Sequence, residues 1–125
     1  MTYFLLIKGR FPGLNDYVAA ERANRYKGAQ MKREAQTVAV WAIREQLRGV
    51  HIKHPVRLSY TFYEPDRRRD HDNVAAFAHK VIQDALVVCG VLADDGWNEV
   101  VGFSDEFYLD RTNPRIEVVI DEEVF

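Results

Sequence analysis

The sequence predicts one α+β domain, in which helices pack on a mixed sheet in the order β-α-β-α-β-β. Three observations support this class. Residues 56–62 alternate apolar and polar side chains, as a strand with one buried face does. Residues 31–42 and 74–88 carry apolar residues at helical spacing. The chain of 125 residues has the length of a single domain, and no repeat or linker divides it, so one domain is expected to span residues 1–125.

The first half of the chain predicts a strand and then a long helix. Tyr3 to Ile7 is a short apolar run rich in aromatic and branched side chains, which favours a strand. Helix formers dominate from Asp16 to Arg48. One face of this helix carries Met31, Ala35, Val38 and Ala42. Gly28 is expected to divide a mobile entry segment from the main helix, and Gly49 to end it.

The second half predicts a strand, a helix and two further strands. After the alternating strand at 56–62, the positions of Val74, Phe77, Val81, Ala85 and Val88 mark the buried face of a second helix. Gly90 ends that pattern at a C-cap position. Val100 to Leu109 and Arg115 to Ile120 are then expected as strands joined by a turn, and they complete the sheet.

Composition excludes several classes of protein. The single cysteine, Cys89, can build neither a disulfide framework nor a Cys-rich zinc site. No run approaches the roughly 20 apolar residues that cross a bilayer, and Met1 to Lys8 lacks the basic start of a signal peptide. We therefore expect a cytoplasmic protein without a membrane partner. The histidine pairs, at 51 and 54 and at 71 and 79, lack a third close ligand and are interpreted as incidental rather than as zinc sites.

Charge is distributed unevenly along the chain. Residues 1–69 hold 14 Lys and Arg against 6 Asp and Glu, which gives +8, and residues 70–125 hold 3 against 13, which gives −10; the sum is the overall net charge of −2. A basic half favours a polyanionic partner, and an acidic half favours cations.

The segment Tyr63 to Asn73, which reads YEPDRRRDHDN, concentrates opposite charges where a strand leads into a helix. Asp70 and Asp72 are two residues apart, so at an extended strand end both side chains project to one side and can approach one hard cation. Bound Mg²⁺ or the three preceding arginines would neutralise their mutual repulsion. The alternative is structural: Asp72 caps the helix and Asp70 pairs with an arginine in a solvated loop.

A second acidic cluster, Asp94 and Asp95 followed by Gly96, comes after this helix. Taken alone it is typical of a turn. The two clusters meet only if the chain doubles back.

In the order and spacing of these elements the chain resembles the RusA-like crossover junction endodeoxyribonucleases. That family's pattern has a basic run, then Asp-x-Asp-Asn opening a helix, a lysine before Asp-Ala-Leu, and an acidic turn. The matching residues here are Arg67, Arg68 and Arg69, then Asp70 to Asn73, then Lys80, then Asp84 to Leu86, and then Asp94 and Asp95. One departure is that about one extra helical turn separates Asn73 from Lys80.

The resemblance implies a Mg²⁺-dependent endonuclease that resolves four-way (Holliday) junctions or related branched DNA by paired nicks. It implies that Asp70, Asp72 and Asp95 are the metal ligands, with Asp94 as a companion, and that Lys80 is the catalytic or phosphate-contacting lysine. For Asp84 a simple ion pair with Lys80 is the preferred interpretation. The resemblance further implies a homodimer, and a recombination or repair role of the kind found in bacteria and their phages. Mn²⁺ is expected to replace Mg²⁺, and no nucleotide cofactor is expected.

DNA binding is then expected to rest on phosphate contacts and to weaken with salt. The candidates are Arg67, Arg68, Arg69 and Asn73, together with Arg25, Lys27, Lys32 and Arg33 of the long helix. Two other functions stay open. One is a non-catalytic DNA-binding or structural module whose acidic residues only cap and pair. The other, less favoured, is a zinc-dependent or restriction-type nuclease, for which the chain lacks an Asp/Glu-x-Lys segment after a suitable aspartate.

Overall fold

The computed structural model describes residues 1–123 and confirms the α+β class. Its elements, in chain order, are β1 (Thr2–Lys8), α1 (Leu14–Ala23), α2 (Arg25–Gln46), β2 (Val56–Glu64), α3 (His71–Val88), β3 (Val100–Leu109) and β4 (Arg115–Glu122). The order is therefore β-α-α-β-α-β-β, with one helix more than the sequence predicted. Among the described residues, none of the helices combines the length and the apolar character that crossing a membrane requires.

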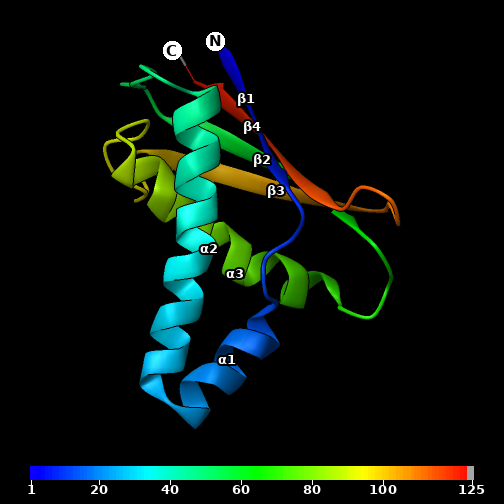
Figure 1. Cartoon of the computed structure of the whole chain (residues 1–125). Helices are drawn as coiled ribbons and strands as arrows, with labels where there is room; N and C mark the ends of the chain where they lie inside the picture. The colour runs from blue at the N-terminus through cyan, green and yellow to red at the C-terminus, as the bar shows by residue number, and fades with distance from the viewer. Residues whose placement is uncertain (124–125) are drawn as a thin grey trace.

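The four strands form one mixed sheet in the order β1-β4-β2-β3. β4 pairs antiparallel with both β1 and β2, whereas β3 runs parallel to β2 on the other side. A parallel pair needs a crossover connection, and α3 provides it. β3 and β4 are successive strands but are not neighbours, because β4 inserts between β1 and β2 (Figure 1).

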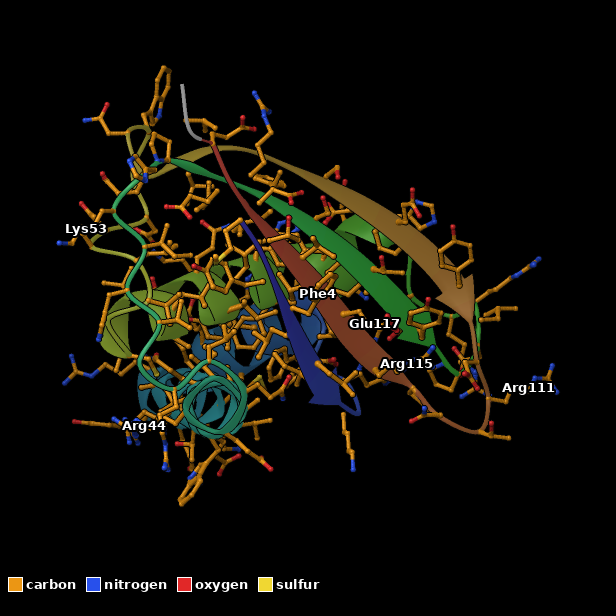
Figure 2. The ribbon with its side chains drawn as sticks, turned by 90° about the horizontal axis from the view of Figure 1, so that it is seen from above. Phe4, Arg44, Lys53, Arg111, Arg115 and Glu117 are labelled. Carbon is orange, nitrogen blue, oxygen red and sulfur yellow. The ribbon has the colours of Figure 1, made fainter. Side chains whose placement is uncertain are left out.

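The helices gather on one side of the sheet, so the core lies between them and that face (Figure 2). The inward positions of β2 are all buried, from Val56 through Phe62 to Glu64. α3 contributes the largest helical share of this core, and its Val81, Ile82, Ala85 and Leu86 are fully buried. This packing fixes α3 along the sheet, and both candidate acidic clusters flank that helix.

The long helix breaks at Asn24 and not near Gly28. Asn24 has an extended backbone (φ −169°, ψ 126°), and its side chain accepts a hydrogen bond from Tyr26 N at 2.8 Å. Asparagine is a strong N-cap, so α2 begins directly after it. Gly28 instead lies inside α2, where a Cβ atom would collide with the Glu21 side chain of α1. The segment that was expected to be mobile is helix α1.

The buried face of α2 is also shifted from the prediction. Val38 is exposed, and Ala39 and Ile43 take the fully buried positions after Ala35. Val88 at the end of α3 is likewise exposed. The face that α2 buries is made mostly of alanine because it packs closely against α1 and α3. Helical spacing alone does not decide whether Val38 or its neighbour Ala39 continues the buried face after Ala35.

Candidate active site

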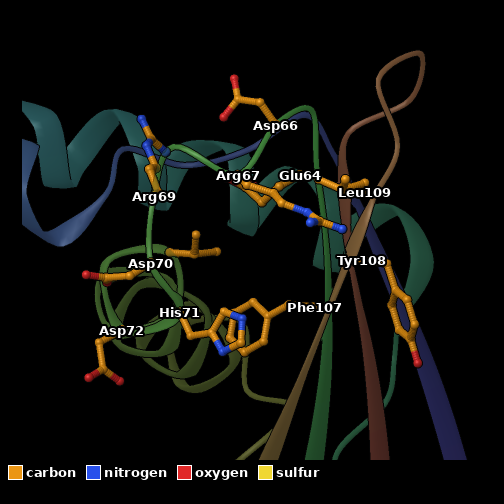
Figure 3. Close-up of a pocket in the computed structure, with 11 residues that line it drawn as sticks. Glu64, Asp66, Arg67, Arg69, Asp70, His71, Asp72, Phe107, Tyr108 and Leu109 are labelled. Carbon is orange, nitrogen blue, oxygen red and sulfur yellow. The ribbon is translucent and has the colours of Figure 1, made fainter.

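The loop between β2 and α3 sets the first acidic pair. Asp70 is the N-cap of α3, with an extended backbone, and its Oδ1 accepts a hydrogen bond from Asn73 N at 2.9 Å. The cap is therefore Asp70, and not Asp72 as the structural alternative supposed. Asp72 lies in the first helical turn and is exposed. Figure 3 shows both carboxylates on one flank of this turn, whereas His71 faces the opposite way, toward Phe107.

Arg69 and Asn73 hold α1 against the start of α3. Arg69 donates to the Phe11 carbonyl at 2.9 Å and to Asp16 at 3.0 Å. The Oδ1 atom of Asn73 accepts a hydrogen bond from Asn15 N at 2.8 Å. Both side chains are thus engaged in packing the first loop and α1 against the candidate site.

The other two arginines of the basic run are exposed. Arg68 has 90% of its side chain accessible, and its ion-pair partner is Asp66, at 3.9 Å. Arg67 extends from its loop toward Tyr108 of β3 (Figure 3). These two side chains are the exposed positive charges next to the aspartates.

The second acidic cluster folds back onto the middle of α3. Lys80 Nζ lies 3.0 Å from Asp84 and 3.8 Å from Asp95, and Lys32 of α2 lies 3.6 Å from the same Asp84. The ion pair expected between Lys80 and Asp84 is present. The hydrogen bond that the Lys80 ammonium donates to Asp84 is the main cause of the raised pKa of Lys80, and the nearby charges of Asp84, Asp95 and Asp94 act in the same direction.

The two acidic clusters stay apart. Within residues 1–123 no group of three or more His, Cys, Asp or Glu side chains lies close enough to hold a metal ion. Asp95 sits beside Lys80, and Lys80 is eight residues beyond Asp72, which corresponds to about 12 Å along a helix axis. The chain does double back after α3, as a shared site requires, but the return ends about two turns short of Asp70 and Asp72.

A pocket of about 820 Å³ opens beside the first cluster. Its lining is Glu64, Asp66, Arg67, Arg69, Asp70, His71, Asp72, Val74, Phe107, Tyr108 and Leu109. The His71 and Phe107 rings stack in its wall with centroids 3.9 Å apart and an interplanar angle of 2°. The pocket therefore combines carboxylates, an exposed cation and a flat apolar wall.

Sequence reasoning missed Glu64 and Phe107. The predicted strand ends at residue 62, yet β2 continues to Glu64, which points inward like Val56, Leu58, Tyr60 and Phe62. The two-residue period of that strand, extended by one step, would have found it. Phe107 belongs to the strand paired with β2, and no local pattern links it to His71.

The remaining predicted residues lie further from the pocket. Arg25 and Lys27 are exposed at the start of α2, and Arg33 lines a separate hollow on that helix together with Trp41 and Arg44. The histidines do not form the two pairs suggested by their spacing. Their partners are Gly90 for His51, Glu122 for His54, Phe107 for His71 and Asp105 for His79.

Comparison with known families gives one result that covers most of the chain. A family model described as Endodeoxyribonuclease RusA matches residues 11–121. The match includes both acidic clusters, the basic run and Lys80. No curated protein sequence matches the chain.

Proposed function

This chain belongs to the RusA endodeoxyribonuclease family, and on that premise we propose that it resolves four-way junctions or related branched DNA by paired, Mg²⁺-dependent nicks. One observation carries the proposal beyond the family match. Asp70 and Asp72 present two carboxylates from one flank of the first turn of α3, beside a pocket with exposed arginine. That combination suits a cation and a phosphate held together.

The proposed metal ligands are carboxylates. Asp70 and Asp72 supply hard oxygen donors, and Mg²⁺ accepts so small a protein set because it keeps several of its own waters. Asp95 is the third proposed ligand, with Asp94 as its companion. Asp95 now lies beside Lys80, so this assignment requires the turn after α3 to move toward the start of that helix when DNA binds. Mn²⁺ takes similar ligands and is expected to replace Mg²⁺.

Each side chain then has a separate task. The divalent ion supplies activation of water and neutralisation of charge on the phosphate. Asp70 and Asp72 would hold that ion. Lys80 stabilises the phosphate as a compact positive charge, and its raised pKa keeps the ammonium protonated across the neutral range. The hydrogen bond from Lys80 to Asp84 orients that ammonium on α3.

DNA contacts are proposed at two surfaces. Arg67 and Arg68 are exposed beside the pocket and would contact the phosphates nearest the cut. The exposed cations of α2, namely Arg25, Lys27 and Arg33, would contact more distant phosphates. Lys32 is paired with Asp84 and would act close to Lys80. Arg69 and Asn73 serve mainly by positioning α1, since both already have partners there.

Paired nicks also require two active centres, and one chain carries one such site. We therefore propose a homodimer of closed two-fold symmetry, the commonest arrangement among soluble homo-oligomers. The sheet face that the helices leave uncovered carries exposed Phe4, Leu6 and Tyr108, and β3 is an edge strand. These features leave area available for a second copy.

A specific observation favours a second candidate, a DNA-binding module without catalysis. Asp70 caps a helix and Asp95 pairs with Lys80, so both have structural tasks in the chain as it stands. In that case the acidic residues would stabilise the fold, and the basic residues alone would carry the function.

A cleavage assay separates the two candidates. A labelled four-way junction and a linear duplex of the same sequence are incubated with the wild type, with Asp72→Asn and with Asp121→Asn, in Mg²⁺ and in EDTA. Asp121 is a matched control because its carboxylate lies at the far end of the sheet, bonded to Thr2. We expect paired nicks in the junction from the wild type and from Asp121→Asn, only with metal. If all three proteins bind the junction and none cuts it with Mg²⁺ or Mn²⁺, the binding module is correct.

A further inference from the structure

Glu64 is the one polar or charged residue that is buried among residues 1–123, with 8% of its surface exposed. Its Oε1 atom accepts a hydrogen bond from Arg10 Nη1 at 3.1 Å. Burying a carboxylate is costly unless its charge is paired and its oxygens are bonded. Arg10, the ion-pair partner of Glu64, is itself one-third exposed. Glu64 also lines the pocket, so a ligand there can use the accepting capacity that Arg10 leaves free.

The pocket has the dimensions and the walls of a site for a flat, polar-edged molecule. Its volume of about 820 Å³ falls in the usual range for small-ligand sites, about 300 to 1,000 Å³. The His71 ring stacks in parallel on Phe107, which in turn stacks on Phe62, so the ring of His71 is the one whose outer face is left for a ligand. Val74 and Leu109 add apolar lining.

The polar groups of the pocket lie around that lining. Glu64 and Arg67 lie where β2 ends, and the proposed metal ligands Asp70 and Asp72 form the rim at the start of α3. A nucleobase has apolar faces and hydrogen-bonding edges. Its faces could contact the aromatic lining of the pocket while its edges meet the surrounding polar groups.

We propose that the pocket receives one unstacked nucleobase next to the bond that is cut, and that Glu64 selects bases with an amino group over thymine. The proposal rests on the proposed nuclease function, whose metal ligands form the pocket rim. A carboxylate can only accept hydrogen bonds. Adenine, cytosine and guanine each carry an amino group with two hydrogens, whereas the only edge donor of thymine is its N3–H, which two carbonyl oxygens flank. Thymine would therefore offer Glu64 a single hydrogen bond and bring two oxygens close to the carboxylate.

The test measures binding in EDTA, so it needs no cleavage. Fluorescence anisotropy of labelled dA12, dC12 and dT12 is recorded with the wild type, Glu64→Gln and Glu122→Gln. Glutamine nearly preserves the shape of Glu64, but its amide group can also donate a hydrogen bond to a thymine carbonyl. The variant should therefore bind thymine better than the wild type does. Glu122 is the control because it too is largely enclosed and paired, with His54 at 2.7 Å, at the opposite end of the sheet. We expect the wild type and Glu122→Gln to favour dA12 and dC12 over dT12 by about fivefold or more, and Glu64→Gln to narrow that ratio to about two.

Phe107→Leu provides a second test that leaves the pair between Glu64 and Arg10 in place. Leucine removes the ring on which His71 stacks, so His71 loses its fixed orientation. The affinity for all three oligonucleotides should then fall by about tenfold without a change in their ratio. Wild-type affinity in Phe107→Leu would overturn the proposal even if Glu64→Gln failed to fold.

Two further results would also overturn it. One is that Glu64→Gln lowers the melting temperature and reduces the affinity for all three oligonucleotides equally. That result would mean that Glu64 only stabilises the first loop through its bond with Arg10. The other is that Glu64→Gln changes sedimentation but not the ratio, which means that a second copy fills the pocket. A shifted ratio in a protein that cuts no junction would support the base pocket while rejecting the nuclease.

Discussion

Lys80 Nζ lies 3.8 Å from Asp95 Oδ2, so the acidic turn after α3 returns to the middle of that helix. Asp95 therefore lies about two helical turns from Asp72, beside the Lys80 ammonium. The contact also links two proposed functional groups directly, since a phosphate that binds Lys80 would compete with Asp95 for the same positive charge.

Replacing Lys80 should impair cleavage more than binding. For Lys80→Gln we expect the single-turnover cleavage rate of a four-way junction to fall by about 10²- to 10³-fold, because one stabilising charge at the phosphate is lost. Junction affinity should change much less, since several other cations remain. Lys53→Gln is the control, because it removes an exposed lysine from the loop before β2, outside the proposed site. Equal rates in the wild type and Lys80→Gln would exclude this role.

The double task of Asp70 can be divided by two substitutions. Asn accepts the same hydrogen bond from Asn73 N and is a strong N-cap, so Asp70→Asn should leave the free energy of unfolding almost unchanged. Asp70→Ala should lose about 1 kcal/mol. Both variants should lose metal-dependent cleavage, because neither supplies a carboxylate. Urea unfolding and the junction assay together check this. If Asp70→Asn cuts at the wild-type rate and only the less stable Asp70→Ala is impaired, Asp70 serves as a helix cap alone.

Gly13 is predicted to be intolerant of a side chain. A Cβ atom there would lie 2.6 Å from Asn73 Oδ1, and Gly13 is buried. Gly13→Ala should therefore destabilise the fold by about 1 to 3 kcal/mol. In an Asn73→Ala background the same substitution should cost much less, because the clashing atoms are gone. The double-mutant cycle measures this coupling, and additive effects would show that the contact between the first loop and α3 is unimportant.

The fold was predictable where one local rule decides each position. The alternation of apolar and polar residues at 56–62 fits only a strand with one buried face. The apolar residues of α3 recur along one helical face and predict that helix from their spacing. The break at Asn24 was missed because a strong N-cap competed with a glycine, and the glycine in fact serves close packing of α1 on α2.

The candidate site was predictable as a list of residues but not as a geometry. The position of Asp95 depends on how the turn after α3 contacts Lys80, and the role of Glu64 depends on a pocket wall supplied by β3. Both are contacts between segments distant in the chain, and a one-dimensional pattern carries no signal for them.

Tyr60 gives a pH-dependent prediction for stability. Burial raises the pKa of its phenol well above the usual value of 10, more than the hydrogen bond from Gln83 lowers it. Because the pKa is higher in the folded state, the unfolded chain ionises first. Stability from this residue is therefore complete below pH 10 and falls above it, by up to about 1.4 kcal/mol per pH unit.

Tyr60→Phe is the matched variant for that effect. It loses the bond to Gln83 and should be less stable than the wild type by about 1 kcal/mol at pH 8. The difference should shrink as the pH rises above 10, since only the wild type has the phenol to ionise. Urea unfolding between pH 8 and 11.5 provides the comparison. If the two proteins differ by the same free energy of unfolding across that whole range, burial does not raise the pKa of Tyr60.

Arg68 and Arg69 should differ in their effect on DNA binding. Arg68 is 90% exposed at its side chain, so Arg68→Gln should leave thermal stability unchanged and reduce the slope of log affinity against log salt by about 0.9. Arg69→Gln should lower the melting temperature, because contacts to Phe11 and Asp16 are lost. Salt titrations of junction binding and thermal melts would show both effects. Identical behaviour of the two variants would reject the division into contacting and positioning arginines.

Manganese binding tests most directly whether Asp70 and Asp72 form the metal site. Electron paramagnetic resonance of Mn²⁺ is recorded with the wild type, Asp72→Asn and Asp95→Asn, with and without a four-way junction. We expect the wild type to bind Mn²⁺ more tightly than Asp72→Asn by about tenfold or more, and Asp95→Asn to weaken binding mainly when the junction is present. Equal Mn²⁺ affinity in the wild type and Asp72→Asn, with and without DNA, would contradict the proposed centre.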